Sequence, residues 1–211
     1  MNILLKHEQL NQQNSQLSNS VHSVLRPSLG LVAVGFLIAG MLYATASVSI
    51  AQLIFPKQAN GSVIELNGNV VGSSLVGQNF VSEAYFHGRP SAVSYSVDGM
   101  AGSNLAVANP DLQKQIKERT AQFAQNNQIT EQQVPNEMVT ASGSGIDPDI
   151  SPESAFLQVK RVALQRHLLE QPVRDLVQQQ IRPAQFGVYG QARVNVLQLN
   201  LALDQLSSTP R

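Results

Sequence analysis

The chain has 211 residues, no cysteine and no tryptophan, and its 14 Lys and Arg residues are matched by 14 Asp and Glu residues. This length suits one modest domain with accessory segments, and the balanced charge excludes the basic patch with which nucleic-acid-binding proteins neutralise phosphates. The absence of cysteine excludes disulfides, thiolate metal sites and a cysteine nucleophile. The four histidines lack the spacing of zinc ligands, so no metal is expected; they are His7, His22, His87 and His167.

The chain begins with a polar stretch that is followed by a long apolar one. Residues 1–26 include HEQLNQQNSQLSNS, which has too few apolar side chains to form a core, and they are predicted to be a flexible tail. Residues 27–56 contain no charged side chain or histidine and are predicted to form a transmembrane helix, because about 20 apolar residues suffice to cross a bilayer. Small residues let a second helix approach closely, so Gly35 and Gly40 are candidate contacts with a partner.

A cleaved signal peptide is the alternative interpretation of the apolar segment. Residues 44–46, ATA, resemble a cleavage site behind an apolar stretch. The uncharged region is longer than the usual core of a signal peptide and a long polar leader precedes it, so a retained anchor is favoured. Arg26 and Lys57 flank the span symmetrically, but Lys6 slightly favours a cytoplasmic N-terminus, with residues 57–211 outside the cytoplasm.

Residues 57–211 are expected to form a small mixed extracytoplasmic domain, which makes the chain an α+β protein with a single N-terminal transmembrane helix. In VIELNGNVVG, Asn67 and Gly68 separate two β-branched runs and predict a hairpin with a type I′ turn. In YFHGRPSAV, an aromatic pair suited to core packing precedes a turn. Arg89 in that turn is either an ordinary surface arginine or a contact with an anion or a partner.

The remaining elements are predicted from helix signals and apolar periodicity. Asn109 and Ser151 can each cap a helix, and the second helix is expected to extend to about Glu170. Apolar side chains follow one face of that helix, and its basic residues are assigned to the other face: Lys160, Arg161, Arg166 and His167. Alternating leucines in RVNVLQLNLALDQL predict a half-buried strand whose last turn could instead be helical.

The run TASGSGIDPDISP, residues 140–152, is compatible with several kinds of site. A phosphate cradle would need the lysine that follows the glycines of a P-loop, and a calcium loop would need more acidic ligands than the two aspartates present. A nucleophile at Ser142 or Ser144 would need a base, for which only His87 or His167 is available. Every residue of the run also has a turn or capping role, so a structured turn is favoured.

Several blocks of this sequence resemble one known family. They are GSVIELNGNVVGSSLVGQNF, YFHGRPSAVSY, AGSNLAVANPDL, SGSGIDPDISPESAFLQVKRVA and RVNVLQLNLALD, and they follow one another in this order between residues 26 and 204. On these blocks the chain resembles the C subunit of the Kdp-type potassium-transporting P-type ATPase, the KdpC family. The resemblance implies a single-span accessory subunit of a bacterial potassium pump, with its N-terminus in the cytoplasm and its folded domain outside the cell (inner) membrane.

The resemblance also implies partners and a ligand. In this family a channel-like subunit conducts potassium and a P-type ATPase subunit hydrolyses ATP, while the C subunit is no enzyme by itself and holds no cofactor tightly. The C subunit is needed for assembly and activity and is described as a catalytic chaperone that raises the affinity of the pump for ATP. By resemblance, the residues that contact ATP would be Ser142, Gly143, Ser144 and Gly145. The candidate contacts of the folded domain with partner subunits are Arg89, Ser103, Asn104 and Asp147.

The expected topology conflicts with a direct contact between the domain and ATP. Cellular ATP is cytoplasmic, whereas one helix with its N-terminus inside leads the following domain to the far side of the bilayer. We therefore expect an interaction subunit, in which the helix docks in the lipid bilayer and the domain packs at the outer mouth of the channel-like subunit. The alternative is a membrane-tethered extracytoplasmic ligand-binding module or hydrolase, which the serines of the loop suggest.

Overall fold

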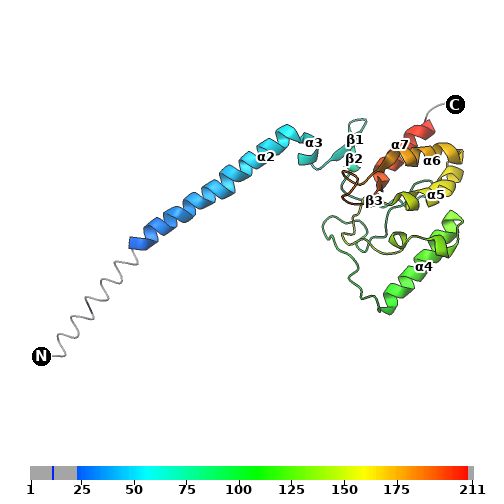
Figure 1. Cartoon of the computed structure of the whole chain (residues 1–211), viewed down its shortest axis with the longest axis horizontal. Coiled ribbons are helices and arrows are strands. Elements are labelled where there is room, and N and C mark those ends of the chain that lie inside the picture. The colour runs from blue at the N-terminus through cyan, green and yellow to red at the C-terminus, as the bar shows by residue number, and fades with distance from the viewer. Residues whose placement is uncertain (1–10, 12–22, 209–211) are drawn as a thin grey trace. The chain divides into compact units, whose positions relative to one another are not determined.

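The computed structural model describes residue 11 and residues 23–208, which divide into two compact units. The first unit, Met1–Asn60, contains a long apolar helix, and the second, Gly61–Arg211, contains the strands and most of the helices (Figure 1). Because the second unit mixes helices and strands, the predicted α+β class is confirmed. The predicted polar tail lies outside the described residues, apart from residues 11 and 23–26.

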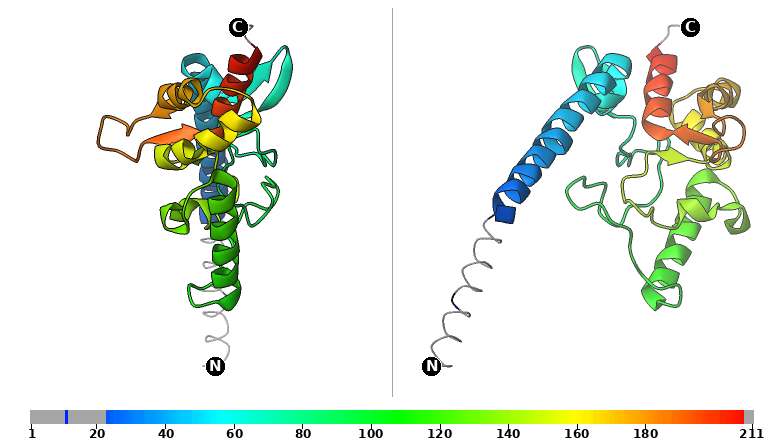
Figure 2. Two further views of the ribbon diagram at one scale, coloured as in Figure 1. Left: turned by 90° about the vertical axis from the view of Figure 1, so that its right-hand side faces the viewer. Right: turned by 60° about the vertical axis from the view of Figure 1, so that its left-hand side comes forward.

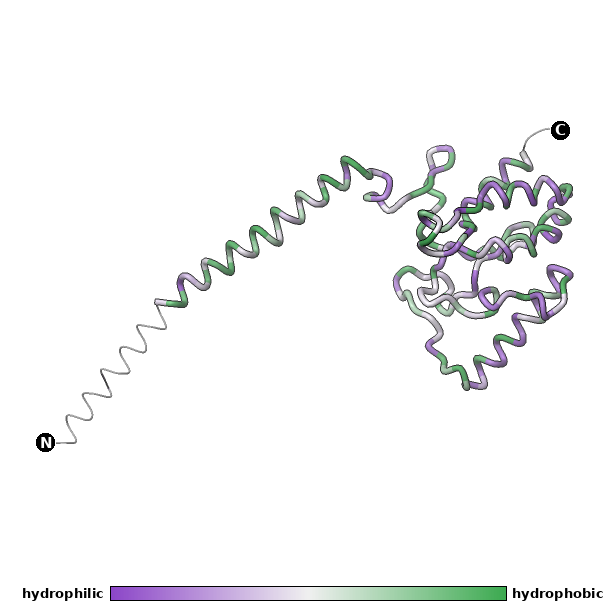
Figure 3. The backbone as a smooth tube through the Cα atoms, in the orientation of Figure 1, coloured by the Kyte–Doolittle hydropathy of each residue, from purple (hydrophilic) through white to green (hydrophobic). Residues whose placement is uncertain are grey.

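The first unit is built around one helix, Ser23–Ile54, in which apolar residues predominate (Figure 3). Its 32 residues extend about 48 Å at 1.5 Å per residue, more than the roughly 30 Å of a bilayer core. The helix contains a π-helical turn, Leu37–Leu42, which is followed by α2, Tyr43–Ile54, and then by the short α3, Pro56–Ala59. Length and composition therefore suit this helix to crossing a membrane.

The helix differs at both ends from the span predicted at residues 27–56. It includes Arg26, whose long side chain can carry its charge along the helix to the membrane surface. It stops at Ile54, because Phe55 precedes a proline and leaves the helical conformation, with φ −131° and ψ 56°. Pro56 then takes the first position of α3.

The second unit begins with a β-hairpin. β1, Val63–Leu66, pairs in antiparallel fashion with β2, Asn69–Ser73. The connecting Asn67 and Gly68 have φ angles of 52° and 78°, the left-handed values that a type I′ turn requires. The predicted hairpin and its turn type are confirmed.

A second sheet and four longer helices make up the rest of this unit (Figures 1 and 2). The sheet has three short antiparallel strands, with β5, Arg193–Asn195, between β3, Asp149–Ile150, and β4, Ile181–Arg182. The helices are α4 (Pro110–Asn127), α5 (Pro152–Gln165), α6 (Glu170–Gln180) and α7 (Val196–Ser208), with the 3-10 turns η2 (Glu131–Gln133) and η3 (Asn136–Met138). α5 packs against α4 and α6, and α6 packs against α7.

Both predicted helix caps are present. The side chains of Asn109 and Ser151 accept hydrogen bonds, at 2.8 and 3.1 Å, from the N–H groups two and three residues further on. The helix that starts after Ser151 ends at Gln165 rather than near Glu170. The chain turns away at His167, whose φ of 55° is left-handed.

The predicted C-terminal strand is wrong beyond Asn195. The chain forms α7 from Val196 onward, and the Asn195 side chain accepts a hydrogen bond from the N–H of Gln198 at 3.1 Å, as an N-cap residue does. The leucines alternate in the sequence, but Val196, Leu199 and Leu203 also follow a spacing of three and four, and all three are buried. Leu197 is buried as well, but Leu201 is only partly buried and Asn200 is buried, so the helical spacing describes the buried face better than the alternation does.

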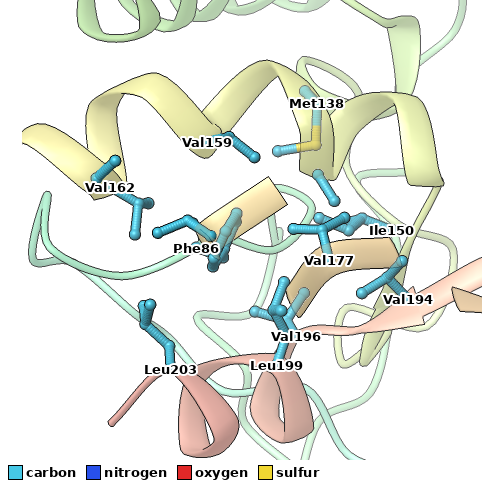
Figure 4. Close-up of a cluster of buried hydrophobic side chains, with 13 residues drawn as sticks. Phe86, Met138, Ile150, Val159, Val162, Val177, Val194, Val196, Leu199 and Leu203 are labelled. Carbon is cyan, nitrogen blue, oxygen red and sulfur yellow. The ribbon is translucent and has the colours of Figure 1, made fainter. Parts of the chain in front are cut away.

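The core of the folded unit gathers around Phe86, one of the two aromatic residues predicted to pack. Its side chain is 0% exposed and lies between Val159 and Val162 of α5 and Leu199 and Leu203 of α7 (Figure 4). Burying a side chain of this size contributes about 1.5–3 kcal/mol relative to leaving it exposed. The ring therefore joins the two helices through one shared apolar contact.

The backbone at Phe86 is buried, and its neighbours are partly buried, although the segment belongs to no helix or strand; side chains satisfy its polar groups. Asn200 of α7 accepts a hydrogen bond from the Phe86 N–H and donates one to the Phe86 carbonyl, both at 2.9 Å. Gln158 of α5 does the same for His87, at 2.8 and 3.1 Å. These two amides replace the partners that a neighbouring strand would supply.

Arg161 was assigned to the solvent face of α5, and this prediction is wrong. The residue is 4% exposed, and its guanidinium donates to the carbonyl groups of Glu83 and Tyr85, the latter at 3.0 Å. It also pairs with the Glu83 carboxylate at 3.3 Å and donates to Asn127 and Gln158. Burial lowers the pKa of Arg161, while the nearby Glu83 carboxylate acts in the opposite direction. The many acceptors explain why a guanidinium is tolerated here.

Replacing Asn200 with alanine is expected to lower the free energy of unfolding by roughly 2–4 kcal/mol, because it leaves two buried backbone groups without partners. The measurement is urea unfolding of the full-length chain in detergent, followed by circular dichroism. Asn69→Ala, at an exposed position of the hairpin, is the control and should change stability by less than about 0.5 kcal/mol. Equal stability of the two variants would contradict a structural role for the Asn200 amide.

Candidate functional site

The serine–glycine loop, residues 142–145, is held by its own hydrogen bonds. Ser142 is 2% exposed, and its N–H donates to the carbonyl of Pro90 at 3.0 Å. The Ser142 hydroxyl accepts a hydrogen bond from the N–H of Gly145 at 2.9 Å, and the Ser144 hydroxyl accepts one from the N–H two residues on at 3.2 Å. The loop therefore folds as a structured turn.

The two glycines of this loop differ in their surroundings. Gly145 has a φ of 72°, and a Cβ there would lie 2.4 Å from a methyl carbon of Val93 and 2.7 Å from the carbonyl oxygen of Ala101. Gly143 has open space around it, whereas a Cβ on Gly102 would lie 3.3 Å from the Gly143 carbonyl oxygen. The loop thus packs tightly on segments that precede it by about 40 to 50 residues in the sequence.

Arg89 and Asp147, both predicted as contacts with a partner, form an ion pair with each other at 3.0 Å. Their side chains are 24% and 29% exposed. Asp147 also accepts a hydrogen bond from the N–H of Asp149 at 3.1 Å, and the Tyr95 hydroxyl donates to the carbonyl of Arg89. Burial and the nearby Asp147 carboxylate raise the pKa of Tyr95. This partly buried ion pair joins residue 89 to residue 147 and so positions the two segments relative to each other.

Arg89, Asp147 and the serine–glycine loop come together, and the loop also packs on Ala101 and Gly102, which directly precede the predicted Ser103 and Asn104. We call the set formed by residues 89–90, 101–104 and 142–147 the loop junction. Ser103 in this junction is partly buried, and Asn104 is exposed with a φ of 52°. Gly35 and Gly40 belong to the other unit, and each has open space around it. Contact of any of these residues with a partner stays a prediction.

A pocket of about 470 Å³ lies between residues 79–95 and α4. Its polar lining includes His87, Arg89 and Arg119, and it does not include the serine–glycine loop. The Nε2 atom of His87 lies 3.0 Å from the carbonyl oxygen of Ser82. Burial, and then the positive charge of Arg161, lower the pKa of His87. The ring is therefore neutral near pH 7 and adds no positive charge to the pocket.

The geometry of the described residues does not assemble a hydrolytic or metal site. The hydroxyl groups of Ser142 and Ser144 accept hydrogen bonds from backbone N–H groups, and the His87 ring is paired with the carbonyl of Ser82 rather than with either serine. Within residue 11 and residues 23–208, no group of three or more His, Asp or Glu side chains could hold a metal ion. The N–H groups of Ser142 and Gly145 are bonded inside the fold, so these two groups do not face a phosphate.

Three residues that organise the unit were missed by sequence reasoning: Gln158, Arg161 and Asn200. Each is a polar residue on a helix face that is otherwise apolar. Asn200 interrupts the run LQLNLAL, and Gln158 lies one turn after the buried Ala155. Such an interruption is the signal that could have found them, because a buried amide is retained only where its partners are present.

Gly145→Ala is expected to destabilise the folded unit by about 2 kcal/mol, because the methyl group meets two neighbours and the left-handed backbone disfavours any Cβ. Gly143→Ala is the matched control from the same loop and should change stability by less than about 0.5 kcal/mol. Thermal unfolding of the two full-length variants measures the difference. Similar losses in both variants would mean that the tight packing at Gly145 does not stabilise the fold.

Comparison with known proteins confirms the resemblance seen in the sequence blocks. The family described as K+-transporting ATPase, c chain (KdpC), matches residues 25–205. A protein named potassium-transporting ATPase KdpC subunit from Gemmatimonas aurantiaca is 50% identical over 188 residues, which cover 88% of this chain and 94% of the relative. Proteins of the same name from Dechloromonas aromatica and Acidobacterium capsulatum are 45% and 44% identical, and the alignments cover 88% and 86% of this chain and 98% of each relative. With matches over most of its length, the chain belongs to the KdpC family, the c chains of potassium-transporting ATPases.

Proposed function

We propose that this chain is a non-catalytic accessory subunit of a potassium-transporting ATPase, held in the bacterial cell membrane by a single helix. The relatives are named as subunits of that ATPase, and we infer the identity of the complex from these names. The non-catalytic, membrane-bound role is inferred from two features together. The chain has a 32-residue apolar helix, and the hydroxyl groups of Ser142 and Ser144 in the folded unit accept hydrogen bonds from its own backbone. Such a chain has the parts needed to bind partners and lacks an assembled catalytic group among its described residues.

The proposed partners are a channel-like subunit that conducts potassium and a P-type subunit that hydrolyses ATP. Within the membrane, Gly35 and Gly40 are proposed as contacts, because any atom of a neighbouring helix could approach the backbone closely there. Gly40 lies in the π-helical turn Leu37–Leu42, and π-helical turns occur frequently at functional sites. Because a small residue and an irregular turn coincide at Gly40, we propose that a helix of a partner subunit contacts this position.

Outside the membrane, the loop junction is proposed as the contact with the channel-like subunit. No helix or strand occurs between β2, which ends at Ser73, and α4, which begins at Pro110. Connections of this length without secondary structure are uncommon in compact domains and usually serve a function. Hydrogen bonds and close packing at Arg89, Gly102 and Gly145 order this segment, so it offers a preformed surface.

The effect on ATP that the family resemblance implies is proposed to be indirect. With the N-terminus in the cytoplasm, the folded unit that starts at Gly61 lies on the outer side, away from cellular ATP. A subunit placed there can raise the affinity of the pump for ATP only by favouring one conformation of the ATP-hydrolysing subunit. The internal hydrogen bonds of the Ser142 and Gly145 N–H groups, which take two of the four loop N–H groups away from a nucleotide, support this assignment over direct nucleotide binding.

Removing this chain is expected to abolish potassium-stimulated ATP hydrolysis by the purified complex, and Gly40→Leu is expected to reduce copurification of the chain several-fold. The larger side chain meets nothing in this chain, so a loss of binding must come from a neighbouring helix. Copurification from detergent and ATPase assays with and without potassium measure both effects.

Two controls accompany this experiment. The amount of Gly40→Leu chain in the membrane must equal that of the wild type, which separates assembly from insertion. A C-terminal tag should be cut by protease added to intact spheroplasts, since the folded unit is proposed to face outward. Full activity of a complex that lacks this chain, or a tag protected in spheroplasts, would contradict the proposal.

Ser144→Ala is expected to leave the KM of the complex for ATP within about twofold of the wild-type value, because the exposed hydroxyl serves only the turn. Steady-state ATPase kinetics of the purified complex give this value. A large increase in the KM for ATP, with an unchanged kcat, would instead support direct contact between the loop and the nucleotide.

A further inference from the structure

The connection between β4 and β5 forms a closed hairpin that stands out from the folded unit (Figure 2, left view, orange). Its end, residues 183–192, is called the hairpin tip. Gln185 and Tyr189 exchange two backbone hydrogen bonds, at 2.8 and 2.9 Å, and the N–H of Gly187 donates to the carbonyl of Ala184 at 3.0 Å. These bonds give the tip a defined shape before it meets any partner.

The hairpin tip exposes three large apolar side chains together. Phe186 is 84% exposed, Val188 78% and Tyr189 69%. Single apolar residues are common on protein surfaces, but a cluster at a projecting position indicates a site of interaction. Phenylalanine and tyrosine are also among the residues enriched in protein interfaces, where they supply much of the binding energy.

The backbone at Phe186 is a second, independent observation. Its φ of 54° lies in the left-handed region, which is rare for bulky residues and costs about 1–3 kcal/mol. A glycine or asparagine would adopt this conformation at lower cost, as Asn67 does in the β1–β2 turn. Phe186 has a strained backbone, and its ring adds nothing to the core. Both facts are explained if the ring contacts another molecule.

Charge distinguishes a protein partner from a lipid surface. Residues 183–192 contain no Asp, Glu, Lys, Arg or His. The arginines on either side are engaged within the fold, since Arg182 donates to Gln198 and Arg193 pairs with Asp149 at 3.1 Å. Binding to a membrane surface gains strength from free basic side chains near phosphate headgroups, and the tip has none to offer. A neutral apolar socket on a protein matches it better.

The area of the tip argues against a second copy of this chain as the partner. Two aromatic side chains and a valine present on the order of 400 Å², whereas a stable interface buries roughly 800 Å² on each partner. The tip alone therefore cannot hold two chains together. It can add to the binding of a partner that the membrane helix already keeps nearby, because tethering makes the second contact intramolecular.

We propose that the hairpin tip docks into a neutral apolar socket on another subunit of the ATPase, at a point separate from the loop junction and the membrane helix. This inference rests on the proposed role as an accessory subunit and adds a third contact to it. Phe186 is the central side chain of the contact, with Val188 and Tyr189 beside it. The backbone of the tip already holds the ring in a fixed orientation. Binding therefore does not have to order a loose segment, which would cost entropy.

Phe186→Gly tests the role of the ring without threatening the fold. Glycine relieves the left-handed strain, so the melting temperature of the full chain should stay the same or rise, while its affinity for the remaining subunits falls at least about tenfold, as for loss of an interface hot spot. Asn67→Gly is the matched control, because it makes the same change at an exposed left-handed position without removing an aromatic ring. The affinity of the Asn67→Gly chain for the remaining subunits should equal that of the wild-type chain.

A photo-cross-linker identifies what the tip touches. The chain has no cysteine, so Val188→Cys can be labelled with benzophenone maleimide before the chain is combined with the remaining subunits. Illumination should join it to another subunit, whereas the same label at the exposed Leu164→Cys of α5 should give no such product. Adducts with lipid or with a second copy of this chain would overturn the proposal.

The two proposals fail in different ways. If the wild-type chain binds the remaining subunits but Phe186→Gly binds equally well, and position 188 gives no cross-link to them, the docking of the tip is refuted and the accessory role stands. If the wild-type chain does not bind those subunits at all, the accessory role is refuted and the docking of the tip with it.

Discussion

The folded unit depends on one constraint, which is that the backbone from residue 83 to residue 87, buried at Phe86 and partly buried on either side, must find hydrogen-bond partners without a neighbouring strand. Asn200 and Gln158 each bind the N–H and the carbonyl of one residue in this segment. Arg161 and Arg166 donate to the carbonyl groups of Tyr85 and Ala84 in the same segment. Because these side chains come from α5, α7 and the turn that follows α5, the segment is held on two sides, and Arg89 is positioned directly after it. The loop junction is therefore placed by hydrogen bonds of the core.

Elements with a local cause could be predicted from the sequence. The Asn67–Gly68 turn needs two left-handed residues, and the caps at Asn109 and Ser151 need one side-chain oxygen at the start of a helix. The apolar helix needs only length and the absence of charge. In each case the physical cause lies within a few residues, so tertiary contacts had little opportunity to change the outcome.

Elements with a distant cause could not be predicted in the same way. The leucines that end the chain satisfy both a strand and a helix pattern, and the choice depends on which face meets Phe86. Arg161 looks like a solvent-exposed residue until the carbonyl groups of a segment about 80 residues earlier surround it. The ion pair between Arg89 and Asp147 likewise joins two loops that no local pattern connects. Candidate site residues could be named, but their pairing with one another could not.

The amide of Asn200 also bears on how the chain is completed during synthesis. It reaches a residue 114 positions earlier, and it lies on α7, the last helix of the described chain. Residue 86 therefore leaves the ribosome long before Asn200 exists, and this part of the core cannot close until α7 has followed. A polypeptide that stops short of α7 lacks the Asn200 amide, so the Phe86 backbone gains its partners only once α7 has been made.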